Sequence, residues 1–328
     1  MAQPYYYPYP YGGQRLGGFL RLMAALLIVV VVFWFLSGPL TTYLQTGVWP
    51  WQPVPEEPYV GPIAATVYLQ DALAKVSASG SVRWYAKRGG SWLFLGSGNM
   101  TINLETQDGG MIYMVPESSA YYIDDSKTIS GSGYVQSVSY EDIDNDGIDE
   151  HIFALKFTRT NVQAPQGVTP SVSISVFMVK YDSGISLNSP SDQTGVGTGT
   201  KDVYINWKLI FSEVNTGVKI MKIELYVNDS GAFDVVTVDV NTWAKSFGTA
   251  EITEDRTGLR WIIFSVTTES DMIFAQYAQG MNPDFAYITV HLKTAFAGGE
   301  KYAFTLKITI YKPDGTKATI SDVVNVAA

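Results

Sequence analysis

Residues 141–150 hold the most suggestive chemistry in this 328-residue chain, because they read Glu-Asp-Ile-Asp-Asn-Asp-Gly-Ile-Asp-Glu. Six carboxylates in ten positions repel one another in water unless a cation holds them together. In a calcium loop, acidic residues alternate along the chain until a Gly allows a sharp turn. Asp142, Asp144, Asp146 and Gly147 follow that spacing. Oxygen ligands without imidazole or thiolate favour Ca²⁺ over softer metals.

The loop departs from the helix–loop–helix calcium hand, because Phe153 stands where that family has a bidentate Glu. With β-strands expected at 134–140 and 151–157, it instead resembles the DxDxDG-type calcium loops of integrin-type FG-GAP repeats. The resemblance covers about a dozen residues and occurs once, so it implies one structural calcium site and not a propeller. A solvated acidic turn is the alternative interpretation. The ligands that the resemblance implies are Asp142, Asp144, Asp146, Glu150 and the main-chain carbonyl of Ile148, with Asp149 as a substitute for Glu150.

Alternating apolar and polar residues run through most of the chain after Gly80, which indicates strands with one face in a core and one in water. Regular βαβ spacing is missing from the sequence, so a parallel α/β fold is not expected. The predicted fold class is mainly β, with an N-terminal transmembrane helix and two antiparallel domains of the β-sandwich or jelly-roll kind. The clearest strands are predicted at 81–87 and 91–95, around the turn Arg88-Gly89-Gly90, and at 172–178, 203–211, 286–292 and 302–310.

Composition and pattern divide the chain into six segments. They are a Tyr- and Pro-rich disordered tail at 1–15, a transmembrane anchor at 16–46, a Pro-rich stalk at 47–63, a β-rich domain at 64–160 that begins with a short helix at 64–76 and contains the calcium loop, a linker at 161–170, and a β-sandwich or jelly-roll domain at 171–328.

The anchor is predicted from Leu22–Leu36, fifteen residues without a polar side chain. Extended back to Leu16 the stretch is about 21 residues long, which spans a hydrocarbon core of about 30 Å as a helix. Residues 1–55 contain two basic residues, Arg15 and Arg21, and no acid. The positive-inside rule therefore places the N-terminus in the cytoplasm or a virion interior and the C-terminal domains outside.

Gly18-Phe19, just before this apolar stretch, resembles the processing site of type IV pilins. The resemblance implies a filament subunit with an N-terminal apolar helix and a β domain. Two departures from the family pattern stand against it. Met23 occupies the position where the family usually has Glu, and Arg21 interrupts the start of the apolar run.

Composition excludes several functional classes. The absence of cysteine excludes a disulfide scaffold, a thiol enzyme and a cysteine-ligated metal, and the net charge of −9 argues against nucleic acid as a partner. The two histidines, His151 and His291, accompany no G-x-S-x-G elbow, and the sequence has no Walker A loop. We therefore predict that the protein is not an enzyme and has no catalytic or cofactor-binding residues.

Two further sets of residues are candidates for surface chemistry. Asn99 and Asn228 begin N-x-[ST] sequons on the predicted external side, so both are candidate glycosylation sites. Tryptophans in the external part can form a carbohydrate platform, although core packing accounts for most of them. These tryptophans are Trp84, Trp92, Trp207, Trp243 and Trp261.

Together these features predict a single-pass, externally displayed structural or assembly protein stabilised by calcium, such as a cell-envelope component, an adhesin or a virion spike. The expected partners are the lipid bilayer, through residues 16–46, and copies of the chain itself or another envelope or virion protein. The alternatives are a type IV pilin-like filament subunit and a ligand- or glycan-binding accessory subunit of a membrane complex.

Overall fold

The computed structural model forms two compact units, residues 1–57 and 58–328. It describes residues 21–31, 56–124, 134–145, 147, 149–188, 190–192, 199–227, 233–242, 245–249, 260–281, 286–296 and 301–327. The predicted tail at 1–15, most of the predicted anchor and the first part of the stalk lie outside the described residues.

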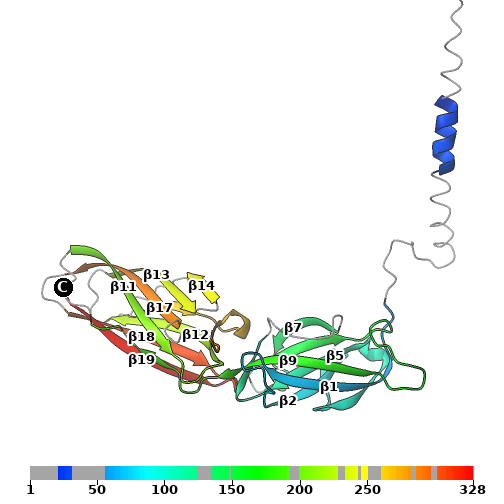
Figure 1. Ribbon diagram of the computed structural model, residues 1–328, viewed down its shortest axis with the longest axis horizontal. Coiled ribbons are helices and arrows are strands. Elements are labelled where there is room, and N and C mark those ends of the chain that lie inside the picture. Colours follow the sequence, from blue (N-terminus) through cyan, green and yellow to red (C-terminus); the bar gives the residue numbers. More distant parts are fainter. Residues whose placement is uncertain are drawn as a thin grey trace, which may run out of the picture. The chain divides into compact units, whose positions relative to one another are not determined.

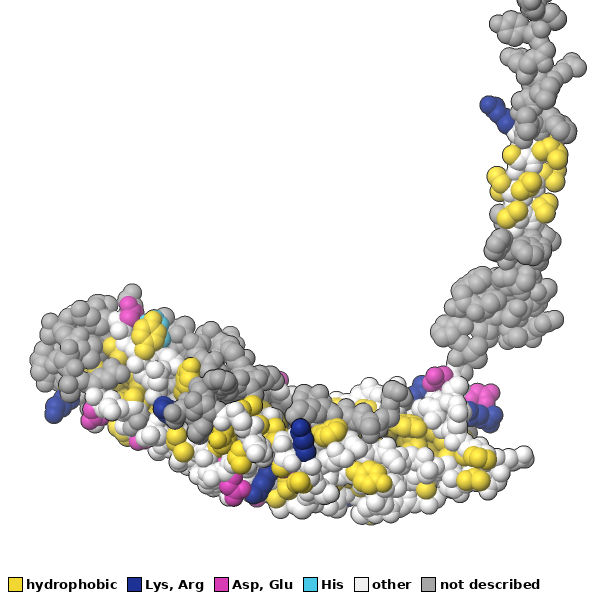
Figure 2. All heavy atoms as spheres, viewed as in Figure 1, with side chains coloured by type: hydrophobic (Ala, Val, Ile, Leu, Met, Phe, Trp, Pro, Cys, Tyr) yellow, Lys and Arg dark blue, Asp and Glu magenta, His cyan; other side chains and the backbone are white. Residues whose placement is uncertain are grey.

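The described part of the first unit is an α-helix at residues 21–31. Eight large apolar side chains of this helix, from Leu22 to Val31, are 43–65% exposed, and Figure 2 shows them along its surface. Within the described residues, no helix is both long and apolar enough to cross a membrane. Of the predicted anchor at 16–46, the structure describes residues 21–31 alone.

The second unit is built almost entirely of β-strands, which confirms the prediction of a mainly β protein (Figure 1). Among the described residues, two short 3₁₀ helices, η1 (Thr106–Asp108) and η3 (Glu269–Asp271), interrupt them. The strands are β1 (Gly61–Asp71), β2 (Ser81–Arg88), β3 (Ser91–Ser97), β4 (Met100–Leu104), β5 (Met111–Glu117), β6 (Tyr121–Ile123), β7 (Val135–Glu141), β8 (Glu150–Lys156), β9 (Ser171–Tyr181), β10 (Ser186–Asn188), β11 (Gly199–Ile210), β12 (Thr216–Val227), β13 (Phe233–Thr242), β14 (Lys245–Thr249), β15 (Arg260–Ser265), β16 (Ile273–Tyr277), β17 (Ala286–Phe296), β18 (Lys301–Tyr311) and β19 (Lys317–Ala327).

The first sandwich packs the five-stranded sheet β3-β2-β5-β8-β7 against strands β6, β9, β1 and β4. Its core draws side chains from both layers, including Trp84 of β2, Phe153 of β8 and Ile174 of β9. Each of these residues alternates with a polar or outward-facing neighbour, so the period-two pattern in the sequence places them on the inner face.

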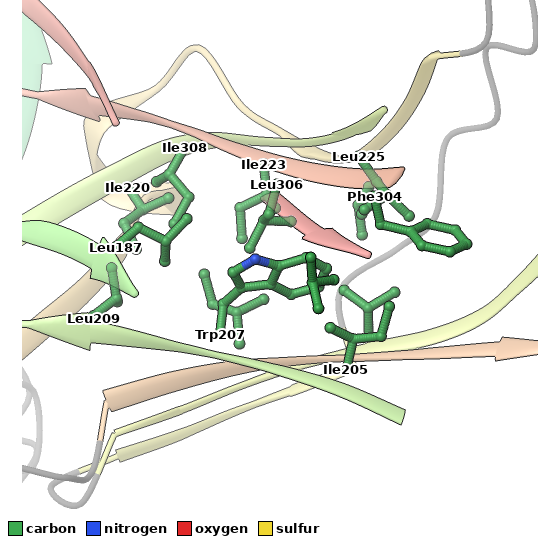
Figure 3. Close-up of a cluster of buried hydrophobic side chains, with 14 of the residues drawn as sticks. Leu187, Ile205, Trp207, Leu209, Ile220, Ile223, Leu225, Phe304, Leu306 and Ile308 are labelled. Atoms are coloured by element: carbon green, nitrogen blue, oxygen red, sulfur yellow. The ribbon is translucent and has the colours of Figure 1, made fainter. Parts of the chain in front are cut away.

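The second sandwich packs the sheet β10-β11-β17-β13-β14 against β19, β18 and β12, with β15 and β16 also paired to β12. Trp207 of β11 is fully buried in its centre. Figure 3 shows the Trp207 indole extending from its strand toward Ile223 and Leu306 on the facing layer. Burial of so large a side chain in a core of branched aliphatic residues stabilises the fold by about 1.5–3 kcal/mol or more.

One nine-stranded sheet contributes a layer to both sandwiches, because β9 of the first pairs with β12 of the second. That pairing is parallel, as is the longer pairing of β1 with β9 from Ala64↔Ser171 to Asp71↔Met178. The prediction of purely antiparallel sheets is therefore wrong at two places. The strands of each parallel pair are far apart in the sequence or belong to different sandwiches. Alternation along one strand shows which of its faces is buried, but it does not show the direction of the strand that pairs with it.

The short helix predicted at 64–76 is also wrong, because β1 occupies Gly61–Asp71. Alanine and leucine recur there at a spacing that fits a helix, but Ile63, Ala65 and Leu69 also alternate toward the first core. β4 and β9 pair with the strand along its two sides, and these ladders outweigh local helix propensity.

Residues 161–170 connect β8 to β9, two strands of the first sandwich, and the chain passes to the second sandwich after β9. Asp182 marks this passage and is almost fully buried. Its carboxylate accepts hydrogen bonds from the Ser212 amide at 2.7 Å and the Thr216 hydroxyl at 3.0 Å. A buried carboxylate with several donors holds the loop before β12 against the end of β9.

Candidate metal centre

The acidic loop joins β7 to β8, which are antiparallel neighbours paired from Val135↔Leu155 to Glu141↔Glu150. Asn145 and Gly147 have φ of +63° and +85°, so the chain reverses through left-handed backbone at these two positions. A side chain at position 147 has open space around it, so this glycine is needed for its backbone conformation and not for close packing. The Gly147 amide donates a hydrogen bond to Asp142 Oδ2 at 3.0 Å.

Three of the predicted ligands converge in space. One carboxylate oxygen from each of Asp142, Asp144 and Glu150 lies within 4.8 Å of the others. Asp146 and Ile148 lie outside the described residues, and Asp149 is described but is not part of this group. Carboxylates gathered at this separation provide the oxygen donors that Ca²⁺ uses, although a full sphere needs 6–8 oxygens. The donor chemistry therefore fits calcium.

Arg83 of β2 is a member of the cluster that the sequence did not predict. Its Nη1 lies 2.9 Å from Asp144 Oδ2 and its Nη2 lies 3.5 Å from Glu150 Oε1. Nη2 also forms an ion pair with Glu117 at the end of β5. One guanidinium therefore joins the loop to three strands of the same sheet. Alternation along β2 places Arg83 on the outer face, but its partners are distant in sequence and no local signal identifies them.

The electrostatics of the cluster favour a permanently charged Arg83. Burial lowers the pKa of its guanidinium, but the hydrogen bond with Asp144 and the charges of Glu117 and Asp144 outweigh burial and raise the pKa above its ordinary value. Burial, together with the charges of Asp144, Glu117 and Glu150, raises the pKa of the neighbouring Tyr85 hydroxyl, while Arg83 opposes this. The negative charges of Asp144, Glu117 and Glu150 therefore still affect Tyr85, although Arg83 lies beside them.

An apolar contact fixes the loop beneath its charges. Ile143, between two of the acids, is 7% exposed and packs with Tyr85, Val115 and Ile152. These three residues lie on the outer face of the five-stranded sheet. The Ile143 amide also donates to Glu150 Oε2 at 2.7 Å. The loop therefore folds back over the sheet instead of extending into solvent.

The cluster borders a cavity of about 510 Å³ at the junction with the second sandwich. Its lining includes Arg83, Glu117 and Glu150 from the first sandwich and Glu269 and Asp314 from the second. Within this lining Arg83 pairs with Glu117 and Glu150, and Glu269 pairs with Lys219.

The remaining candidate residues have separate environments. His291 Nε2 lies 3.1 Å from Asp202 Oδ1, and its ring stacks on Tyr204, as for a residue on the polar face of a strand. His151 is buried and stacks on Phe153.

Among the described residues, the candidate glycosylation sites and the tryptophans do not form a recognisable binding surface. Asn99 is exposed in the turn between β3 and β4, where its Oδ1 accepts the Val67 amide at 2.8 Å, and Asn228 lies outside the described residues. Trp84, Trp207 and Trp261 are buried in the cores, and Trp243 is not described.

Comparison with known proteins identifies only a general likeness. No family model and no curated protein matches the sequence. Among solved structures, the major pilin subunit BcpA of Bacillus cereus has 10% identity and a TM-score of 0.29, covering 82% of this chain and 69% of its own. The C-terminal domain of the antigen I/II-family protein AspA of Streptococcus pyogenes has 9% identity and a TM-score of 0.26, covering 82% of this chain and 99% of its own. Likenesses at these scores carry no functional argument.

Replacing Arg83 with Gln is expected to lower the melting temperature of the calcium-free protein, because three carboxylates lose their shared cation. The loss is expected to be about 1–3 kcal/mol. Thermal melts in low salt and in 1 M salt check the cause, since concentrated salt screens the repulsion and should recover part of the loss. Lys87→Gln is the matched control, because the ion pair that Lys87 forms is with one exposed acid, Glu141, and its ammonium otherwise lies over the Trp92 ring, away from the acidic loop. Equal losses in the two variants would contradict this role of Arg83.

Proposed function

We propose that this chain is a membrane-anchored structural or assembly protein, displayed outside a cell or virion and stabilised by calcium. The observation that carries the proposal is the exposed apolar helix at 21–31, which precedes a large β unit. Each Leu, Ile, Val or Met side chain left in water forgoes about 1.5–3 kcal/mol of burial free energy. Eight such side chains on one short helix are favourable only in lipid or against a partner.

Lipid is the environment that the flanking residues favour. Within the described helix the sole charged residue is Arg21, at its N-terminal end, which suits the cytoplasmic headgroup region. The apolar sequence continues to Leu36 beyond the described helix. An anchor over residues 16–46 then leaves all residues after 46, with 20 basic and 31 acidic side chains, on the outside.

The calcium role follows from the outward position of the loop. Extracellular modules bind calcium with dissociation constants of about 10⁻⁴–10⁻³ M, which suffices where calcium is abundant. Asp142, Asp144 and Glu150 would hold the ion, and Arg83 would neutralise the charge that the ion leaves uncompensated. The ion would fix the geometry of β7 and β8 and needs no catalytic partner, which supports a structural function over an enzymatic one.

The anchor is tested by changing one apolar residue of the helix to a charge. Val30→Arg should release much of the full chain from membranes in a carbonate wash, because an arginine at a helix centre costs about 2.5–3.5 kcal/mol of insertion free energy. Val168→Arg is the matched control, because Val30 and Val168 are both 57% exposed and Val168 lies in the β unit. Release of the unmodified chain by the same wash would overturn the anchor.

The calcium site is tested by thermal melting with and without a chelator. At calcium ten- to a hundredfold above the dissociation constant, binding stabilises the fold by about 1.4–2.7 kcal/mol, so chelation should lower the melting temperature by about 3–10 °C. Asp144→Asn should abolish that difference, whereas Asp202→Asn, an exposed acid of the second sandwich, should preserve it. A melting temperature that is the same with and without the chelator would exclude a structural calcium site.

A further inference from the structure

The edge strand β3 (Ser91–Ser97) has a free side in the part of the chain that the structure describes, because β2 is its only ladder partner. Its sequence, Ser-Trp-Leu-Phe-Leu-Gly-Ser, contains neither charge nor proline. Leu93 is 42% and Phe94 is 54% exposed. An uncharged apolar edge of this kind is a template for pairing with another strand.

Other described edges carry features that discourage pairing. In β19, the charged residue Asp322 stands at a position where the strand faces the core. The backbone amide of Asn325 in the same strand donates a hydrogen bond to Asp192 Oδ1 at 2.9 Å, so it is not available to another strand. β7 is broken by a bulge near Val135, while β4 and β10 are short. Inward charges, bulges and short edges are the usual protections against edge-to-edge association. β3 has only a bulge, near Leu95, which leaves Ser91–Phe94 regular.

The hairpin geometry shows which backbone groups of β3 face outward. Gly89 and Gly90 have φ of +59° and +86°, a two-residue turn that makes Arg88↔Ser91 a hydrogen-bonded pair. Pairs alternate along an antiparallel ladder, so Trp92 and Phe94 belong to non-hydrogen-bonded pairs with β2. Their amides and carbonyls therefore point to the free side.

The same hairpin is held rigidly at its tip. Arg88 Nε lies 2.7 Å from Asp108 Oδ1, and Arg88 Nη2 lies 2.9 Å from Asp108 Oδ2, so a two-bonded ion pair ties the end of β2 to η1. On the outer face, the Phe94 ring contacts Tyr85 edge-on, with centroids 5.5 Å apart. An edge fixed in this way loses little conformational freedom when a second strand joins it.

We infer that β3 pairs antiparallel with β3 of a second copy of this chain, about a two-fold axis at Leu93. The segment Trp92-Leu93-Phe94 has the pattern aromatic–leucine–aromatic in both directions. In the antiparallel pairing an aromatic residue of one copy therefore lies opposite an aromatic residue of the other, and no like charges oppose one another. Trp92 of each copy would pair with Phe94 of the other through four backbone hydrogen bonds in all. The two five-stranded sheets would become one continuous sheet.

This contact is small and is expected to be weak in solution. Confinement of many copies to one membrane raises their effective concentration and makes weak contacts count. That advantage rests on the proposed anchor, but the pairing itself depends only on β3. The pairing would explain how displayed copies assemble without any further protein.

The absence of cysteine allows a direct test by cross-linking. In the inferred register the two Leu93 residues form a non-hydrogen-bonded pair, whose Cα atoms lie about 4.5 Å apart, within the range of a disulfide. Leu93→Cys in the full chain, in nonionic detergent with a mild oxidant, should form a covalent dimer on a non-reducing gel. Val323→Cys on β19, which is 44% exposed, is the matched control and should cross-link at least tenfold more slowly.

A second substitution distinguishes specific pairing of the two β3 strands from random collision of two copies. Phe94→Lys adds a charge to the edge, so it should slow the cross-linking of Leu93→Cys at least tenfold. Equal rates for Leu93→Cys and Val323→Cys, or no effect of Phe94→Lys, would overturn the inference. The carbonate wash tests the membrane anchor independently of the cross-linking, so failure of the anchor proposal can be distinguished from failure of the β3 pairing.

Discussion

Mutual repulsion among the acids of residues 141–150 is the constraint that the surrounding structure has to satisfy. Three of these carboxylates lie within 4.8 Å of one another, and one guanidinium, that of Arg83, lies among them. Ile143, between two of these acids, is nonetheless buried against the outer face of the sheet, so the loop and its charges are held close to the strands. Arg83 provides part of the balance and ties the loop to three strands. In the proposed function, a calcium ion would provide the rest of this balance.

The position of this loop matters because the two sandwiches are not independent. A shared nine-stranded sheet passes from one to the other, and Asp182 holds the connecting loop with a fully bonded carboxylate. The cavity beside the acidic loop is lined from both sandwiches. The acidic loop therefore lies beside the region where the two sandwiches meet.

Much of the fold could be predicted from period-two alternation, because that pattern reports which face of a strand is buried. Trp207 and the hairpin around Gly89 and Gly90 follow it directly. Strand direction could not be predicted, since the parallel pairing of β1 with β9 joins residues about 107 positions apart in the sequence. The convergence of Asp142 and Asp144 could be predicted from local spacing. The role of Arg83 could not, because an outward side chain on one strand carries no record of its partners across the sheet.

We propose that a calcium ion would fix the acidic loop on the outer face of the first sandwich, in a protein displayed from a membrane. Amide hydrogen exchange, followed by mass spectrometry in calcium and in chelator, tests this most directly. The account predicts that calcium slows exchange in peptides covering 140–152 and in the part of β2 around Arg83, while peptides of the second-sandwich core around Trp207 are unchanged. Identical exchange across 140–152 in the two conditions would contradict it.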